Sequence, residues 1–384
     1  MTIASVETFV LRYSFSPRRG PADAWGSAHE YCLVRIADSD GAVGWGETYL
    51  RPGLEPAVRE LAAGLIGRSP LDASPNWSLI WGSGEFPFAA SALAIGLDDL
   101  RGRLLGVPVA DLYGGRRRDR VRAYAAHQGY VEGVDPARSW RADAEAAVAA
   151  GFTAMKLRIG RYPIAHEVPI LERLAGHELA GMTLLSDASG AYTPSSAIEM
   201  GRQLERLGFA WFEGPLYEWE GYVGYELLPP ALDIPIAGAE VTFSRPAIRE
   251  QLDRGAFDII QPDPVICGGI GEVLFYAALA RLRAVACVPH TSGGAIGIAA
   301  ALQALAAIPD PTNGPLSDAP FLELGMGDNP WRTDVLAAGW ALHDGWVNIP
   351  RGPGLGIEVD EAFVRRSADR GRGETSRPTP PGRR

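Results

Sequence analysis

The sequence almost lacks lysine: it contains 36 Lys and Arg residues, of which Lys156 alone is lysine. Cysteine is also scarce. Cys32, Cys267 and Cys287 are odd in number and widely spaced, which fits neither a disulfide framework nor a zinc site. We therefore expect buried thiols in a reducing, cytoplasmic environment. No apolar run reaches the length of a transmembrane helix, and residues 1–12 alternate like a strand and lack the apolar core of a signal peptide.

Positively charged residues are fewer than negatively charged ones, with 36 Lys and Arg against 46 Asp and Glu. The formal net charge is −10, which disfavours nucleic acid as a partner and means that an anionic substrate must be held by local cations. What the chain does have is 384 residues, 47% of them hydrophobic and 21% charged, which is enough for a large core and two domains.

Short apolar runs recur along most of the chain, and each later run ends on a residue capable of acid, base or metal chemistry. Helical patterns such as residues 202–207 and 272–280 separate them, as in parallel strands joined by crossover helices. The runs occupy residues 121–125, 153–158, 183–187, 209–213, 234–240, 257–263, 284–290 and 321–323. Eight such strands predict a (β/α)₈ TIM-type barrel over residues 116–344, with the polar ends gathered at one mouth.

A different explanation is that each polar residue caps the helix that follows it. Capping accounts for any one of them. It does not account for three carboxylates, a Lys-X-Arg pair and a histidine in succession, so we interpret the set as catalytic.

The barrel is flanked by a smaller predicted domain. Residues 31–36 and 43–47 have the pattern of a hairpin, and residues 88–101 that of a helix, so residues 1–115 predict an α+β capping domain. Residues 345–366 are expected to pack back on this domain and complete it. Residues 14–29, rich in Gly and Pro, predict a loop that is either a lid or a plain connection. The polar segment 367–384 is expected to be disordered.

Three of the predicted strands end on Asp187, Glu213 and Glu240. These are hard oxygen ligands with no Cys or His among them, which favours Mg²⁺ over zinc. Strand alternation places Lys156 and Arg158 on the same side, facing the barrel interior. Because the chain uses arginine almost everywhere else, lysine at position 156 indicates a site where a guanidinium will not serve.

As a set, these residues resemble the enolase superfamily, and in particular its mandelate racemase / muconate lactonizing enzyme-like members. The resemblance covers the chain except its tail. It rests on the Lys-X-Arg pair, on Asp187, Glu213 and Glu240 as metal ligands, on Asp263 with His290 as a dyad, and on Glu323. Residues 44–47 (Gly-Trp-Gly-Glu) and 353–356 (Pro-Gly-Leu-Gly) also match capping-domain signatures of that family.

The resemblance implies a Mg²⁺-dependent enzyme that removes the proton α to a carboxylate, giving an enediolate held by the metal, Lys156 and Glu323. Arg158 departs from members that have a second lysine as the opposing base. Deprotonating Arg at neutral pH costs about 7.5 kcal/mol, against about 4.6 for Lys. We therefore expect His290, oriented by Asp263, to be the single base.

One-base chemistry favours dehydration of an acid sugar to a 2-keto-3-deoxy acid. A cycloisomerase of a sugar lactone or anhydro acid and a racemase or epimerase remain alternatives, as does an inactive barrel that binds a metal and an acid. The expected partners are a small carboxylate substrate and further copies of the chain, with no nucleic acid or membrane. The role of Ser189, two residues after Asp187, stays open. Trp25 and His29 in the 14–29 segment are candidates to contact the far end of the substrate.

Overall fold

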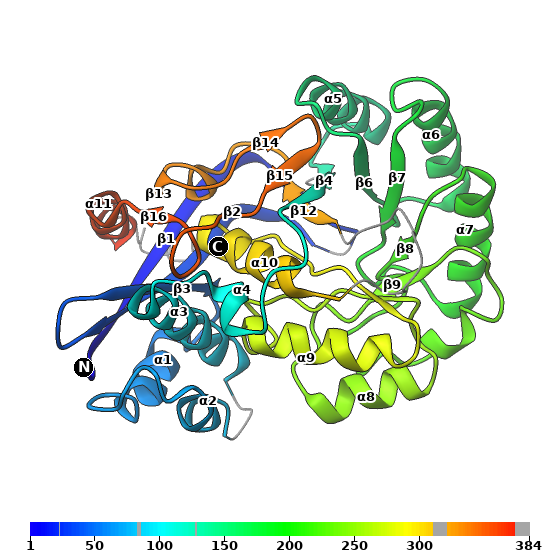
Figure 1. Ribbon diagram of the computed structural model, residues 1–384. Helices are drawn as coiled ribbons and strands as arrows, with labels where there is room; N and C mark the ends of the chain where they lie inside the picture. The colour runs from blue at the N-terminus through cyan, green and yellow to red at the C-terminus, as the bar shows by residue number, and fades with distance from the viewer. Residues whose placement is uncertain (23, 83–85, 127–128, 310–320, 373–384) are drawn as a thin grey trace, which may run out of the picture.

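The structure is a computed structural model that describes residues 1–22, 24–82, 86–126, 129–309 and 321–372 (Figure 1). The N-terminal part combines an antiparallel sheet with helices. Its sheet has the strand order β3-β2-β1-β5. The elements are β1 (Ile3–Gly20), β2 (Gly26–Asp38), β3 (Val43–Tyr49), α1 (Leu54–Ala63), α2 (Ala73–Trp81), α3 (Pro87–Leu105), α4 (Val109–Leu112) and β5 (Tyr130–Val131).

Helix α3 lies unusually close to strand β3. A Cβ atom at Gly46 would lie 1.9 Å from the carbonyl oxygen of Ala92, and one at Gly44 would lie 2.3 Å from that of Gly96. Only glycine permits this approach. Close packing of α3 fixes the C-terminal end of β3, which reaches towards the barrel.

Residues 14–29 are mostly strand, so the prediction of a loop there is wrong. β1 continues to Gly20 and β2 starts at Gly26, with a register shift between Ser14 and Arg19. The end of β1 also pairs with β5, where Gly20 lies opposite Tyr130. Backbone pairing on both sides stabilises a segment whose prolines and charges hide the alternation that marks a strand.

The predicted barrel is confirmed: eight parallel strands run in the order β11-β10-β9-β8-β7-β6-β4, with β12 beside β4. The strands are β4 (Arg120–Ala126), β6 (Ala154–Arg158), β7 (Thr183–Asp187), β8 (Phe212–Glu213), β9 (Ile236–Gly238), β10 (Ile259–Ile260), β11 (Ala286–Cys287) and β12 (Leu322–Gly325). Helices surround them (Figure 1): α5 (Pro136–Ala149), α6 (Ile164–Gly176), α7 (Pro194–Arg206), α8 (Arg245–Asp253), α9 (Ile270–Arg281) and α10 (Ala295–Ala307).

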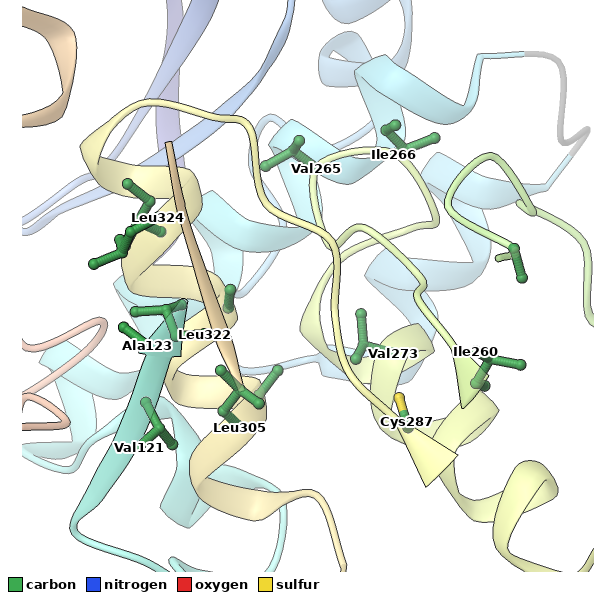
Figure 2. Close-up of a cluster of buried hydrophobic side chains, with 14 of the residues drawn as sticks. Val121, Ala123, Ile260, Val265, Ile266, Val273, Cys287, Leu305, Leu322 and Leu324 are labelled. Atoms are coloured by element: carbon green, nitrogen blue, oxygen red, sulfur yellow. The ribbon is translucent and has the colours of Figure 1, made fainter. Parts of the chain in front are cut away.

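Two apolar layers hold the barrel together. Inside it, Tyr124, Trp211 and Phe321 meet edge to face, with ring centroids 5.6–6.1 Å apart. The second layer lies between strands and helices, where Val121 of β4 and Leu322 of β12 belong to one buried cluster with Leu305 of α10 (Figure 2). All three cysteines are buried, as predicted.

The C-terminal segment differs from expectation in two places. Strand β15 (Trp346–Asn348) pairs antiparallel with barrel strand β4 rather than with the first domain. The turn after it does contact that domain, since the backbone N–H of Leu355 donates to Asp99 over 2.8 Å. Helix α11 (Glu361–Arg372) contacts β1, so residues 367–372 are helical and not disordered as predicted. Residues 373–384 lie outside the described residues.

The remaining short elements are η1 (Tyr225–Leu227), η2 (Pro330–Arg332), β13 (Leu336–Ala338), β14 (Leu342–His343) and β16 (Glu358–Val359). Across the described residues, no helix is both long and apolar enough to cross a bilayer.

Candidate active site

All eight predicted site residues come together at the carboxyl ends of the barrel strands. Those from β6, β7, β8 and β12 lie within their strands, whereas those after β9, β10 and β11 lie two or three residues beyond the strand end. The residues are Lys156, Arg158, Asp187, Glu213, Glu240, Asp263, His290 and Glu323.

Lys156 is the central cation of the site, and its side chain is fully buried. Its Nζ lies 2.6 Å from Glu213 Oε1, 2.8 Å from Glu323 Oε1 and 3.7 Å from Asp187 Oδ2. Burial lowers the pKa of Lys156, but these three carboxylates outweigh burial and raise the pKa above its ordinary value. The side chain is therefore a fixed positive charge here.

Arg158 forms a second cationic contact with the same acids. Its Nη1 lies 2.7 Å from Asp187 Oδ2 and donates to Ser189 Oγ over 2.9 Å. The backbone N–H and hydroxyl of Ser189 donate to Asp187 Oδ1 over 2.8 and 3.0 Å. Burial raises the pKa of Asp187, but Arg158 and Lys156 outweigh it and lower the pKa below its ordinary value. Ser189, whose role was open, thus holds Asp187 and Arg158 in place.

Glu213 is held from both sides. Its Oε2 accepts from the indole N–H of Trp211 over 3.2 Å and from the amide of Gln261 over 2.8 Å. Burial raises the pKa of Glu213 to about 7, although Lys156 opposes the shift. A bound cation would oppose it further.

His290 and Asp263 form the predicted dyad. His290 Nδ1 lies 2.8 Å from Asp263 Oδ2, and its Nε2 lies 3.2 Å from Glu240 Oε2. Asp263 is in turn fixed, because Tyr49 Oη donates to Oδ2 over 2.7 Å and the N–H of Val265 donates to Oδ1 over 2.9 Å. An anionic partner on Nδ1 leaves Nε2 as the nitrogen that faces the site.

The carboxylates around His290 by themselves favour its protonated form, and a cation bound to Glu240 would oppose this shift and favour the neutral imidazole that can accept a proton. Burial lowers the pKa of His290, but Glu240, Glu323 and Asp263 outweigh it and raise the pKa to about 10. The pKa of Glu323 is shifted in the opposite direction to that of His290. Burial raises its pKa, yet Lys156 and His290 lower the pKa of Glu323 to about 2.

Glu323 is fixed by neutral donors as well. Its Oε2 accepts from Tyr124 Oη over 3.1 Å and from the backbone N–H of Thr291 over 3.2 Å. The Thr291 hydroxyl also donates to the Glu323 carbonyl over 2.6 Å, which joins the segment after β11 to β12.

Two adjoining cavities open onto these side chains. One, of about 280 Å³, is lined by Asp187, Glu213 and Glu240. The other, of about 310 Å³, is lined by His290. Arg158, Trp219 and Glu240 line both cavities. The carboxylates and His290 therefore face adjoining cavities that share a wall.

The donor set fits magnesium in kind, because three carboxylates and the amide of Gln261 offer oxygen ligands around one cavity. The carboxylates are not drawn into a closed ligand shell here: among the described residues no three Asp, Glu, His or Cys side chains converge on one point. Lys156 and Arg158 instead neutralise Glu213 and Asp187.

Residues between β1 and β2 border the site. Pro21 and Ala24 line the 280 Å³ cavity, and their carbonyl groups accept from the guanidinium of Arg161. Arg161 also lies 3.8 Å from the centroid of a Trp25 ring. Trp25 therefore packs against Arg161 rather than lining either cavity.

His29, the other candidate in the 14–29 segment, lines the 310 Å³ cavity together with His290. Burial, aided by the positive charge of Arg332, lowers the pKa of His29 to about 4. The imidazole of His29 is therefore neutral at physiological pH.

Several residues that contact the predicted set were not among the residues predicted from the sequence. Gln261 could have been found, because it stands two residues before Asp263 on the same predicted strand and alternation points both inward. Tyr49, Tyr124 and Thr291 carried no comparable signal.

The comparisons with known proteins cover nearly the whole chain. Residues 139–363 match the enolase C-terminal domain-like family, and residues 13–114 match the mandelate racemase / muconate lactonizing enzyme N-terminal domain. The chain belongs to the enolase superfamily, in its mandelate racemase / muconate lactonizing enzyme-like group. The resemblance inferred from the site residues is thereby confirmed.

Among relatives, a D-galactarolactone cycloisomerase from Agrobacterium fabrum is 34% identical over 94% of this chain and 97% of its own length. A D-galactonate dehydratase from Ralstonia nicotianae is 32% identical over 87% and 90%. Among solved structures, L-talarate/galactarate dehydratase from Salmonella typhimurium LT2, liganded with Mg and L-lyxarohydroxamate, superposes with a TM-score of 0.82. It is 25% identical and covers 95% of this chain and 92% of that chain.

Proposed function

We propose that this member of the enolase superfamily is a magnesium-dependent acid-sugar dehydratase in which His290 removes the proton α to the substrate carboxylate. The observation that carries the proposal is the His290–Asp263 pair, with Nδ1 held at 2.8 Å and Nε2 directed to the cavity that also meets the acid cluster. Asp263 orients the ring and stabilises the imidazolium that forms.

Magnesium held by Asp187, Glu213 and Glu240 would supply Lewis-acid stabilisation of negative charge on the substrate carboxylate. Lys156 adds a fixed positive charge at the same place. Glu323, bound to Lys156 and hydrogen-bonded by Tyr124, holds that ammonium in position.

Elimination of water follows proton removal. The C–O bond to the β-hydroxyl breaks, the hydroxyl takes a proton and departs as water, and the resulting enol tautomerises to a 2-keto-3-deoxy acid. Protonated His290 is the donor closest at hand, since the proton it received stays on Nε2.

Arg158 argues against symmetric racemisation or epimerisation. Its pKa is raised further, because the carboxylates of Asp187, Glu323 and Glu213 outweigh the effect of burial. It therefore cannot act as a second base. Lys156 is likewise held charged. An inert barrel is disfavoured, because binding alone would not need His290 oriented on Asp263.

A second candidate is a cycloisomerase of a sugar lactone or anhydro acid, favoured by the 34% identity to a D-galactarolactone cycloisomerase. The same proton abstraction would then expel a ring oxygen instead of a free hydroxyl, and no water would be lost. Dehydratase names among the relatives, and the Mg-liganded structure, support the first candidate and the metal. We place the enzyme in the cytoplasm as a homo-oligomer.

To test the two candidates, the enzyme is incubated with Mg²⁺ and either acyclic acid sugars or sugar lactones. The products are identified by mass spectrometry and by an assay for 2-keto acids. Loss of one water from an acyclic acid supports the dehydratase. A product of unchanged mass from a lactone supports the cycloisomerase.

Proton exchange in D₂O separates the base from the elimination. His290→Asn should abolish deuterium incorporation at the α-carbon for both epimers of a turned-over substrate, whereas Arg158→Lys should retain it. Exchange of one epimer by His290→Asn would reveal a second base and contradict the one-base mechanism.

A further inference from the structure

The cavity that contains His290 also contains a cation that the mechanism does not use. Arg51 lies two residues beyond the end of β3 and lines the 310 Å³ cavity. Its guanidinium lies 5.1 Å from the centroid of the Phe88 ring and 6.0 Å from that of Tyr49. Aromatic contacts restrict where the guanidinium can point without neutralising its charge.

The acids near this cavity are already paired with other groups. Arg12 Nε donates to Glu30 over 2.7 Å, and Glu240 lies 3.2 Å from His290. Within the described part of the chain, no carboxylate forms an ion pair with Arg51. The cavity wall therefore presents a positive charge with free donors, in a protein whose net charge is −10.

The position of Arg51 is tied to the dyad. Tyr49, two residues earlier in the chain, donates to Asp263, and Asp263 holds His290. The end of β3 thus fixes where Arg51 stands relative to the base. A substrate whose α-carbon lies at His290 and whose first carboxylate lies at the acid cluster extends into the cavity that Arg51 lines.

We infer that Arg51 binds a second carboxylate at the far end of the substrate, so that the preferred substrates are dicarboxylate acid sugars rather than monocarboxylates. This inference rests on the proposed function and narrows its substrate class. Arginine suits the role, because its planar donors match a carboxylate in bidentate geometry and its charge is permanent. A terminal hydroxyl would leave Arg51 without an anionic partner.

The experiment compares kcat/KM for an aldaric acid and for the aldonic acid of the same configuration. Arg51→Gln should lower kcat/KM for the dicarboxylate by about 10- to 100-fold, mainly through KM, and leave the monocarboxylate within about twofold. Arg51→Lys should restore part of the loss. Arg59→Gln, on the exposed side of α1, is the matched control and should change neither substrate.

Two kinetic outcomes would overturn the inference: a wild-type enzyme that prefers aldonic acids, or an equal loss on both substrates in Arg51→Gln. Calorimetric binding of a dicarboxylate acid sugar to wild type and Arg51→Gln provides a readout that does not need turnover. If Arg51→Gln binds the dicarboxylate more weakly than wild type does, the inference is supported even when no acid is dehydrated. Equal affinity of the two proteins for the dicarboxylate overturns it.

Discussion

Tyr49, at the end of capping strand β3, donates a 2.7 Å hydrogen bond to Asp263, the carboxylate that holds His290 in the barrel. The same Tyr49 hydroxyl accepts from the backbone N–H of Ser292 over 3.2 Å. The orientation of His290, the proposed base, is therefore set jointly by the two parts of the chain. A substitution in the first part should therefore change the activity of the second.

Replacing Tyr49 by Phe tests this link. Asp263 keeps His290 but loses a donor, so kcat should fall by about tenfold while the fold is retained. Tyr276→Phe is the control, since the Tyr276 hydroxyl is buried with no hydrogen-bond partner among the described residues. Steady-state kinetics with thermal unfolding checks both. Unchanged kcat in Tyr49→Phe would mean that Asp263 is positioned without it.

Lys156 should matter for stability as well as for activity. Lys156→Met leaves Glu213, Glu323 and Asp187 clustered without their central cation, and unfolding free energy should fall by about 3–5 kcal/mol. Arg254→Met removes an exposed ion pair with Glu250 at the end of α8 and should change stability by no more than about 0.5 kcal/mol. Urea denaturation in EDTA measures both. Equal small effects would argue that the acids do not depend on Lys156.

The Glu213→Gln variant tests whether activity depends on bound Mg²⁺. Glu213→Gln removes an anionic ligand while preserving side-chain size, so Mg²⁺ binding should weaken and turnover at ordinary Mg²⁺ concentrations should disappear. Glu205→Gln on helix α7, away from the site, should bind Mg²⁺ like wild type. Isothermal titration calorimetry gives the affinities. Full wild-type activity in EDTA would exclude the metal assignment, and a helix-capping role for Glu213 predicts only a small loss of stability.

The lowered pKa of His29 predicts how the stability of the protein changes with pH. Its pKa is lowered from 6.5 to about 4 by burial, so between these values the unfolded chain binds a proton that the folded chain does not. Its contribution to stability is fully present above pH 6.5 and is lost as pH falls towards 4. The stability advantage of wild type over His29→Gln should therefore shrink between pH 7 and pH 4.5 in denaturant titrations. A constant difference would show that His29 does not resist protonation.

The barrel and its site residues could be predicted because parallel strands alternating with helices recur at a regular spacing along the sequence. Runs buried on both faces end at one mouth, so a polar residue at the end of each run is placed by topology alone. Lys156 and Arg158 followed from alternation within one strand. None of this needs knowledge of a distant contact.

Contacts between distant segments could not be predicted in that way. The pairing of Gly20 with Tyr130 makes residues 14–20 strand, although this segment, with Pro17 and two arginines, shows no alternation. Strand β15 pairs with β4 because that edge is available, which its own sequence does not indicate. Tyr49 reaches Asp263 through the packing of β3 on the barrel, and helix α11 extends past residue 367 where composition alone indicated disorder.

The single lysine has a consequence for chemical labelling. Lys156 carries the only side-chain amine of the protein, and it is completely enclosed by the acids it neutralises. Amine-directed reagents can therefore modify this side chain only when the barrel mouth opens. The rate at which a peptide containing Lys156 acquires a label would count opening events at a single atom, without any engineered reporter.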